Sequence, residues 1–359
     1  MKTLLVVNSL LKYCPRASRQ LDILKTKHEV CVLSTDLNLN GATSHYQLQS
    51  SLGKHKFIKF FLLFLKQYSK YLNLAFTLPD ELKGEKFDKV ICYDLILLPI
   101  LISQIDTKQW SVDLREYYPK QFENSIVWKL TFGRLFNYLC KSQLQSIDEL
   151  TTVSEGLSTL YTNGYGVKPK VRYSLPIYHD LNPSTPNINH IKLVHHGVSN
   201  PNRKLELMIE ATKLLPKYYS LTLYIVNNNE KYYGFLKSII KDHDNIILKA
   251  PLTFEEIIPT LNKYDIGLFC PEKTTENLNY AMPNKLFEFI QARIAIVVTP
   301  LKECSNFVLS QNCGKCSSSF VASDISHTIK SINHNDLKKY KSYSDRIAKV
   351  YSLKHNKEK

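Results

Sequence analysis

Short apolar runs alternate with amphipathic stretches along the whole chain. In the first half, runs rich in Val, Ile and Leu predict strands at Leu4–Asn8, Val30–Ser34, Lys89–Tyr93, Trp110–Val112, Glu149–Val153 and Val171–Ser174. Helical periodicity between them predicts helices at Pro15–Lys27, at Ser125–Gln145 and directly after Ser154, which is placed to act as an N-cap. Strands that alternate with helices are typical of parallel sheets, so the first half is predicted to be an α/β domain.

A polar segment interrupts this alternation in the middle of the chain. Residues 178–190 contain Pro183, Pro186 and several Asn and Asp residues without a regular apolar period, which is typical of a linker. Beyond it, the predicted strands are Ile191–His195, Leu221–Val226, Ile246–Lys249, Ile266–Phe269 and Ala295–Thr299. The helices expected between them are Arg203–Leu215, Tyr232–Lys241, Phe254–Lys263 and Asn284–Ala292.

The two halves predict an α/β protein of two Rossmann-like domains whose parallel sheets face an interdomain cleft. The expected boundaries are residues 1–177 for the first domain, 178–190 for the linker and 191–335 for the second domain. Residues 336–359 are polar and helical in pattern, and are expected to pack back on the first domain. Ligands bind such sheets beyond the carboxyl ends of the strands. No glycine-rich dinucleotide fingerprint follows any predicted strand and no Walker A loop occurs, which disfavours a nicotinamide enzyme.

Composition adds a preference for acidic partners. The chain of 359 residues is 44% apolar, which is enough for sizeable cores, and carries a formal charge of +15. A strong positive charge favours a nucleotide, an anionic membrane surface or a nucleic acid, although a lysine-rich proteome would produce the same balance. The eight cysteines do not form a disulfide framework, and the lone Cys313 and Cys316 pair lacks the two further ligands that a structural zinc needs.

The segment Ala281–Ala292 contains the strongest candidate site. Pro283 is suited to begin a helix, and the helix amino terminus then offers free amides and a positive dipole to a diphosphate. Lys285 adds a charge at the same end, and Glu288 lies one turn away, where a carboxylate can accept both hydroxyls of a ribose. The alternative is an ordinary helix start with a surface ion pair.

Four segments resemble the GT-B glycosyltransferases, most closely the retaining family-4 type that builds bacterial surface polysaccharides. The resemblance lies in Tyr264–Pro300, in Val194–Ala211, in Asp113–Pro119 and in the strand of Asp148–Ser154, and these segments follow the family's order. It implies a GT-B enzyme that moves a sugar from a nucleotide-sugar donor to a glycan or lipid-linked acceptor, with retention, in bacterial surface polysaccharide synthesis.

The resemblance implies roles for individual residues. On the donor side these are Gly197, Arg203, Lys204, Tyr280, Asn284, Lys285 and Glu288. Glu288 matches the family's ribose-binding carboxylate, while Arg203 or Lys204 would neutralise the diphosphate. On the acceptor side the resemblance points to Asp113, Arg115 and Glu116 as catalytic candidates, and a buried Arg bracing a loop between two carboxylates is the structural alternative.

Two positions depart from the family's pattern. Many relatives have a Glu eight residues before the ribose-binding one, where it contacts the transferred sugar, and here that position is Tyr280. The glycine-rich loop after the first strand is replaced by residues 8–16. The nucleotide half of the site therefore follows the pattern more closely than the sugar half.

The same resemblance implies a mechanism without cofactor or metal. Basic residues and the helix amino terminus would stabilise the departing diphosphate in place of a cation, because no D-x-D motif occurs. The anomeric configuration would be retained, with the leaving phosphate taking the acceptor proton.

The segment Lys54–Leu74 is predicted to be a basic, aromatic-rich helix. It has no acidic residue and carries five lysines, which are Lys54, Lys56, Lys59, Lys66 and Lys70. Such a helix suits the headgroup region of an anionic bilayer, and a core-packing helix with a solvated lysine face is the alternative. Neither a signal peptide nor a transmembrane run is apparent, so a cytoplasmic protein that is peripheral on the inner membrane face is expected.

Three other functions compete with glycosyl transfer. A GT-B nucleotide-sugar epimerase would interconvert sugars without an acceptor, and an inactive nucleotide-sugar-binding subunit would show no donor hydrolysis. A nucleic-acid binder would need clustered basic residues with exposed aromatics on one sheet, and no such module is apparent, so no nucleic-acid partner is expected.

Overall fold

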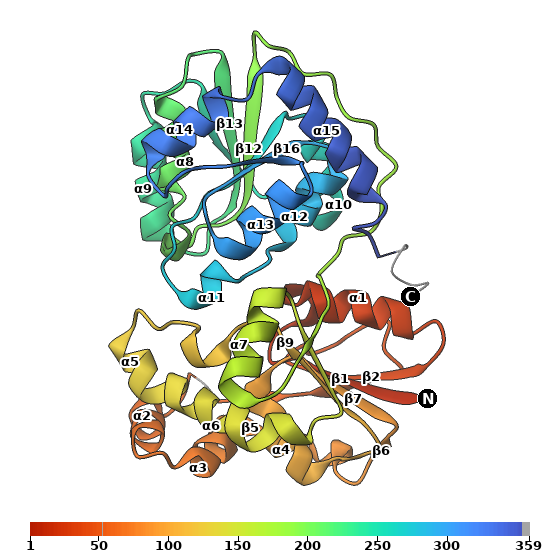
Figure 1. The fold of residues 1–359 in the computed structure, drawn as a ribbon. Coiled ribbons are helices and arrows are strands. Elements are labelled where there is room, and N and C mark those ends of the chain that lie inside the picture. Colours follow the sequence, from red (N-terminus) through yellow and green to blue (C-terminus); the bar gives the residue numbers. More distant parts are fainter. Residues whose placement is uncertain (52, 354–359) are drawn as a thin grey trace. The chain divides into compact units, whose positions relative to one another are not determined.

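The computed structural model describes residues 1–51 and 53–353, and the chain divides into two compact units. The first unit is Met1–Ser174 with Thr275–Asn277, and the second is Leu175–Thr274 together with the chain from Leu278 onward. Figure 1 shows a sheet flanked by helices in each unit. Residues 354–359, the end of the predicted C-terminal segment, lie outside the described residues.

The first unit is built on a seven-stranded parallel sheet. From edge to edge its strands are β11 (Lys170–Val171), β10 (Glu149–Thr152), β9 (Trp110–Leu114), β7 (Lys89–Cys92), β1 (Lys2–Val6), β2 (Glu29–Ser34) and β3 (Ser44–Gln47). Two short pairs accompany it, β4 (Gln49–Ser50) with β5 (Phe76–Thr77) and β6 (Lys86–Phe87) with β8 (Asp106–Thr107). The central strands are almost wholly buried, as expected where helices cover both faces of a parallel sheet.

The helices of the first unit connect these strands. They are α1 (Pro15–Leu24), α2 (Lys56–Phe64), α3 (Tyr68–Ala75), α4 (Leu98–Gln104), α5 (Ile126–Trp128), α6 (Arg134–Gln143) and α7 (Glu155–Tyr165). Ser154 caps α7 as predicted, since its side chain accepts a hydrogen bond from the Leu157 amide.

The predicted single helix Lys54–Leu74 is wrong, because the chain forms α2 and α3 with a break between them. Lys66 adopts a left-handed conformation, with φ of 58°. The Gln67 amide donates to the Leu62 carbonyl and the Lys66 amide donates to the Leu63 carbonyl, which is the Schellman pattern that ends a helix.

The predicted continuous helix Ser125–Gln145 is also wrong in detail. A π-helical turn, Lys129–Gly133, separates α5 from α6. A β-carbon at Gly133 would lie 3.2 Å from the Trp128 carbonyl oxygen and 3.3 Å from that of Pro119, so the turn depends on close backbone contact. Turns of this kind are frequent at functional sites.

The second unit contains a six-stranded parallel sheet. Its strands, in spatial order, are β14 (Ile246–Lys249), β13 (Tyr219–Val226), β12 (Ile191–Val198), β15 (Ile266–Phe269), β16 (Ala295–Val298) and β17 (Gly314–Cys316). The strand order reverses at β12, whose neighbours β13 and β15 lie on opposite sides. Such reversals are where ligands bind in open α/β sheets.

The helices that follow these strands cover both faces of the second sheet (Figure 1). They are α8 (Glu206–Lys213), α9 (Glu230–Ile240), α10 (Phe254–Leu261), α12 (Asn284–Gln291), α13 (Lys302–Ser310), α14 (Ala322–Lys330) and α15 (His334–Ala348). The short helix α11 (Glu276–Asn279) is divided between the units, because Thr275–Asn277 belong to the first unit and the chain from Leu278 belongs to the second. The predicted fold class, an α/β protein with two parallel sheets, is confirmed.

The last helix is fixed to the second unit by buried charges. Lys341 of α15 is fully buried, and its Nζ lies 3.3 Å from Asp265 Oδ1 and 2.8 Å from Ser184 Oγ. Arg293 is also fully buried and lies 2.7 Å from Asp345 of the same helix. Removing one partner of a buried ion pair strongly destabilises the fold, because the other charge is left buried without compensation. The predicted packing of this segment on the first domain stays a prediction.

Candidate functional site

The carboxyl end of β12 forms the centre of the candidate site in the second unit. Gly197 lies near the end of this strand, and a β-carbon there would be 3.0 Å from Lys285 Cε and 3.1 Å from its Nζ. It would also lie 3.5 Å from His195 Nε2. The missing side chain therefore lets the Lys285 ammonium group approach the strand.

Helix α12 delivers Lys285 to this position. Pro283 is the N-cap residue and Asn284 is the first helical residue, so the helix begins where the sequence predicted. Proline has no side-chain acceptor for the first-turn amides, which suits a helix end that receives an anion. Burial and the nearby Arg203 charge lower the pKa of Lys285 to about 8, while Glu288 opposes this shift.

Glu288 lies one turn further along the same helix and is buried, with 7% of its surface exposed. Its Oε2 is 3.1 Å from His196 Nε2, at ion-pair distance but without the alignment of a hydrogen bond. The His196 ring in turn packs edge-to-face on Phe289, with 5.9 Å between ring centres. A β-carbon at Gly267 would come within 2.6 Å of the Phe289 ring, so this glycine allows α12 to lie close to the sheet.

His195, beside this cluster, is held neutral. Its Nδ1 lies 2.8 Å from the Leu268 carbonyl oxygen, which can only accept, so Nδ1 carries the proton and Nε2 keeps its lone pair. Burial, reinforced by the Lys285 charge, lowers the pKa of His195 well below its usual value.

The structure separates the two basic candidates after β12. They stand at the end of the short 3₁₀ helix Pro201–Arg203. Arg203 lies near enough to Lys285 to lower its pKa. Lys204 has a left-handed backbone with φ of 49°, and its Nζ lies 3.9 Å from Glu206. The Arg203 charge therefore acts on Lys285, whereas Lys204 lies beside Glu206.

Tyr280 stands in the loop before α12. The ammonium group of Lys302 lies 5.4 Å from the centre of the Tyr280 ring, a cation–π contact. The neighbouring Asn279 accepts a hydrogen bond of 3.0 Å from the Lys302 amide at the start of α13. The segment before α12 is thus tied to α13 through both residues.

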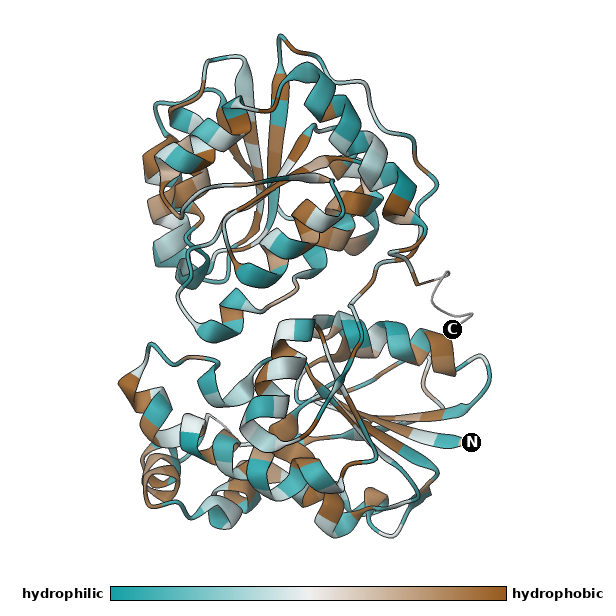
Figure 2. Ribbon diagram, viewed as in Figure 1, coloured by the Kyte–Doolittle hydropathy of each residue, from teal (hydrophilic) through white to brown (hydrophobic). Residues whose placement is uncertain are grey.

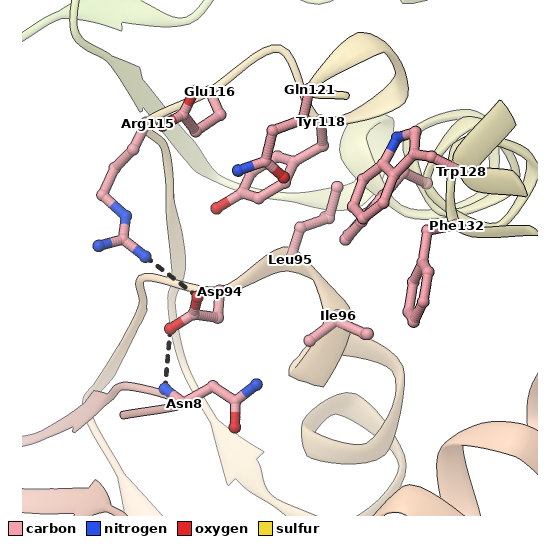
Figure 3. Close-up of a pocket in the computed structure, with 11 residues that line it drawn as sticks. Asn8, Asp94, Leu95, Ile96, Arg115, Glu116, Tyr118, Gln121, Trp128 and Phe132 are labelled. Carbon is pink, nitrogen blue, oxygen red and sulfur yellow. Dashed lines mark hydrogen bonds and ion pairs between the residues drawn. The ribbon is translucent and has the colours of Figure 1, made fainter. Parts of the chain in front are cut away.

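A pocket of about 330 Å³ opens at the carboxyl edge of the first unit's sheet (Figure 3). Polar groups line one side, where Arg115 lies 3.0 Å from Asp94 Oδ1 and the backbone N–H of Asn8 donates to Asp94 Oδ2. Aromatic rings line the other side, with Trp128 and Phe132 stacked at 5.1 Å between ring centres. Glu116 and Gln121 are further polar members of the lining. A pocket with both polar and aromatic walls suits a carbohydrate, which combines hydroxyl groups with apolar ring faces.

Asp113 has a bracing role instead of lining this pocket. It is buried at the end of β9, where Arg16 Nε and Nη2 donate to its two oxygens at 2.6 and 2.7 Å. Thr151 Oγ1 donates to Oδ1 at 2.7 Å. These bonds connect β9 with α1 and β10, so Asp113 differs from Arg115 and Glu116, which do line the pocket.

Solved structures share this architecture over the full chain. HepE of Anabaena, solved in complex with UDP, matches with a TM-score of 0.71 and 12% identity over 100% of this chain and 98% of that one. WaaG, a glycosyltransferase involved in lipopolysaccharide biosynthesis, matches with a TM-score of 0.63 and 11% identity over 99% and 98% of the two chains. For sucrose-phosphate synthase of Thermosynechococcus elongatus the values are 0.71 and 11%, over 99% and 96%.

The chain has the GT-B glycosyltransferase fold. The predicted resemblance is thereby confirmed at the level of the fold. No protein-family model matches the sequence, and no curated protein sequence matches it either.

The GT-B sequence pattern missed several residues of the two sites. His195 and His196 lie inside the segment Val194–Ala211, which resembles the family. Their spacing in the sequence does not indicate that they are neighbours of Lys285 and Glu288. Asp94 directly follows the predicted strand Lys89–Tyr93, and a polar residue directly after a strand is the signal that could have identified it. Trp128 carried no such signal, because the π-helical turn that positions it is not apparent in the sequence.

The predicted membrane-contact lysines divide into two groups. Lys59 is buried, with 4% of its surface exposed, and its Nζ hydrogen-bonds to Ser51 Oγ at 2.9 Å, so it is not available to a membrane surface. The other lysines, Lys54, Lys56, Lys66 and Lys70, are exposed. Within residues 1–51 and 53–353, no helix is both long enough and apolar enough to span a membrane.

Proposed function

We propose that this chain is a glycosyltransferase that moves a sugar from a nucleotide-sugar donor to a glycan or lipid-linked acceptor. The observation that carries the proposal is the approach of Lys285 to Gly197 at the strand-order reversal of a GT-B sheet. This approach gathers an ammonium group, a helix amino terminus and Arg203 where a diphosphate is favoured. HepE, which shares the fold, was solved with UDP, and uridine diphosphate is therefore the first nucleotide to test.

On the donor side, each residue has a distinct role in the proposal. Lys285, Arg203 and the free amides of Asn284 and its neighbours hold the diphosphate. Glu288 accepts hydrogen bonds from the ribose hydroxyls. Tyr280 faces the transferred sugar in place of a carboxylate, and Lys204 adds charge at the edge of the site. Gly197 keeps the space open.

On the acceptor side, Arg115 and Glu116 bind the incoming substrate in their pocket, and Asp113 positions them through β9. In the reaction, the bond between the anomeric carbon and the diphosphate oxygen breaks. The acceptor hydroxyl oxygen forms a new bond to that carbon on the same face, and its proton passes to the departing phosphate. Positive charge at Lys285 and Arg203 stabilises the leaving group, an electrostatic contribution that needs no metal ion.

In this proposal the enzyme is a hexosyltransferase of bacterial surface polysaccharide synthesis, such as capsule or lipopolysaccharide. The protein would work in the cytoplasm, at the inner face of the membrane. The similarity to WaaG, a glycosyltransferase of lipopolysaccharide biosynthesis, supports this setting.

A thermal-shift screen of nucleoside diphosphates and nucleotide-sugars tests the proposal. A ligand that binds only the folded state raises the melting temperature in proportion to the logarithm of its concentration, so a specific donor should be identified directly. The next measurement is hydrolysis of the stabilising nucleotide-sugar, detected as released nucleoside diphosphate. An active transferase should release it, whereas an inactive binding subunit should not. If no nucleotide raises the melting temperature, the proposed function is wrong.

A further inference from the structure

The outer surface of α2 is unusually apolar for a protein surface. Phe57, Ile58, Phe61, Phe64 and Leu65 are 82%, 55%, 57%, 45% and 59% exposed. This helix is among the strongly hydrophobic segments of the first unit in Figure 2. Large contiguous apolar patches on a soluble protein mark a site of interaction with a partner or a membrane.

A groove of about 540 Å³ lies between α2, α3 and the segment that contains the π-helical turn. Its lining is predominantly apolar and aromatic, and includes Phe60, Leu63, Tyr71, Val127, Trp128 and Phe132. Two members of the lining are charged, the exposed Lys56 and the buried Lys59. A long, apolar ligand with an anionic end matches this combination.

The charge of the surrounding segment favours the same kind of ligand. No Asp or Glu occurs between residues 37 and 79, whereas five lysines do. Four of these lysines are exposed, so the surface beside the groove is positive. An anionic group is therefore attracted to the part of the groove wall that Lys56 forms.

The groove also adjoins the polar pocket of the first unit. Trp128 and Phe132 line both cavities. A ligand with a sugar head and a hydrocarbon chain could therefore contact the same two rings from both cavities. An ordinary glycan has no part that would occupy the apolar groove.

We propose that this groove holds the hydrocarbon chain of a lipid-linked acceptor, whose anionic linkage meets Lys56 and whose sugar head occupies the neighbouring pocket. The inference rests on the proposed function for the role of the sugar head. It narrows the acceptor class from any glycan to one that carries a lipid.

The two tryptophans of the chain permit a direct test. Trp110→Phe leaves Trp128, in the groove wall, as the only indole. The probe is dibromostearoyl lysophosphatidic acid, a single acyl chain with a phosphate head, because bromine quenches an indole only on contact. We expect the brominated lipid to quench most of the Trp128 fluorescence, and the same lipid without bromine to leave it nearly unchanged.

Adjacent exposed residues provide a matched pair of variants. Val127 lines the groove and is 61% exposed, whereas Ile126 is 73% exposed and is not part of the lining. Val127→Arg should abolish quenching, while Ile126→Arg, which adds the same charge, should retain it. Absence of quenching in the parent, or equal loss in both variants, would overturn the inference, since equal loss indicates adsorption to the outer surface.

A parallel measurement of nucleotide binding distinguishes failure of the lipid groove from failure of the proposed glycosyltransferase function. UDP should raise the melting temperature equally in the parent and in both variants, because the changed residues belong to the first unit. Stabilisation by UDP without quenching would reject the groove alone. Quenching without stabilisation by any nucleotide would reject the proposed function and leave a lipid-binding groove.

Discussion

The Nε2 atom of His196 lies 3.1 Å from Oε2 of Glu288, and this pair joins the end of β12 to the second turn of α12. Both side chains are buried, with 9% and 7% of their surfaces exposed. The carboxylate is thus buried between the His196 ring and the helix turn that carries Lys285. A buried carboxylate has little conformational freedom left to lose when it accepts the hydroxyls of a ribose.

Glu288→Gln should weaken binding of UDP by roughly 10- to 100-fold, because a hydrogen bond to a charged group contributes about 1.5–3 kcal/mol. The amide keeps the size of the side chain but lacks its charge. Isothermal titration calorimetry with UDP measures the effect. Glu303→Gln, in α13, is the control and should bind UDP as the parent does. Equal affinity of Glu288→Gln and the parent would contradict the ribose assignment.

UDP affinity should fall as the pH rises through about 8, the pKa of Lys285 in the free protein. Below this pH the ammonium group is already charged. Above it, binding must first take up a proton, so each further pH unit weakens affinity by up to about tenfold. Lys285→Arg should bind UDP with a flat profile over the same range, because guanidinium stays charged. A parent profile that is flat between pH 7 and 9.5 would remove Lys285 from the diphosphate site.

Gly197→Ala should weaken UDP binding while the fold is retained. The new methyl group would stand 3.0 Å from Lys285 Cε, and the φ of 157° at this position is one that side chains rarely adopt. The flexible lysine would move away from the strand and lose its place beside the diphosphate. Calorimetry should show a weaker affinity, and circular dichroism should show unchanged secondary structure.

Gly234→Ala is the matched control for this change. Gly234 lies in α9 of the same unit, and its added β-carbon would meet no atom within 4 Å. Alanine in a helix interior stabilises by roughly 0.5–1 kcal/mol relative to glycine. The control should therefore melt slightly higher and bind UDP normally. Equal losses of affinity in both variants would indicate a general effect on folding.

Asp113→Asn should destabilise the protein by roughly 3–5 kcal/mol, the usual cost of removing one partner from a buried ion pair. Arg16 would lose the carboxylate to which it donates two hydrogen bonds. Urea denaturation measures the loss, and UDP binding by the second unit should persist below the midpoint. Asp80→Asn, which removes a surface pair with Lys83, should leave the midpoint unchanged. A stable Asp113→Asn variant without transfer activity would instead assign Asp113 to catalysis.

Local pattern was sufficient for most strands of the two sheets and for the start of α12. The predicted strands Ile246–Lys249 and Ile266–Phe269 coincide with β14 and β15, because each is a short apolar run between polar residues. Helices α4, α13 and α14 and strands β3 and β17 were not predicted. The α4 segment has a continuous apolar run that shows no periodicity, and β17 is a short strand that begins at Gly314.

The alternation of apolar runs and helices by itself determined the α/β class and the two parallel sheets, since each element buries a face that its own residues define. Only the tertiary structure decided which polar groups meet. Arg115 pairs with Asp94 from a different strand end, and the charge of Arg203 lowers the pKa of Lys285. His196 reaches Glu288 from another element altogether. These contacts join residues far apart in the chain, and their distances depend on packing between elements, which a one-dimensional pattern does not contain.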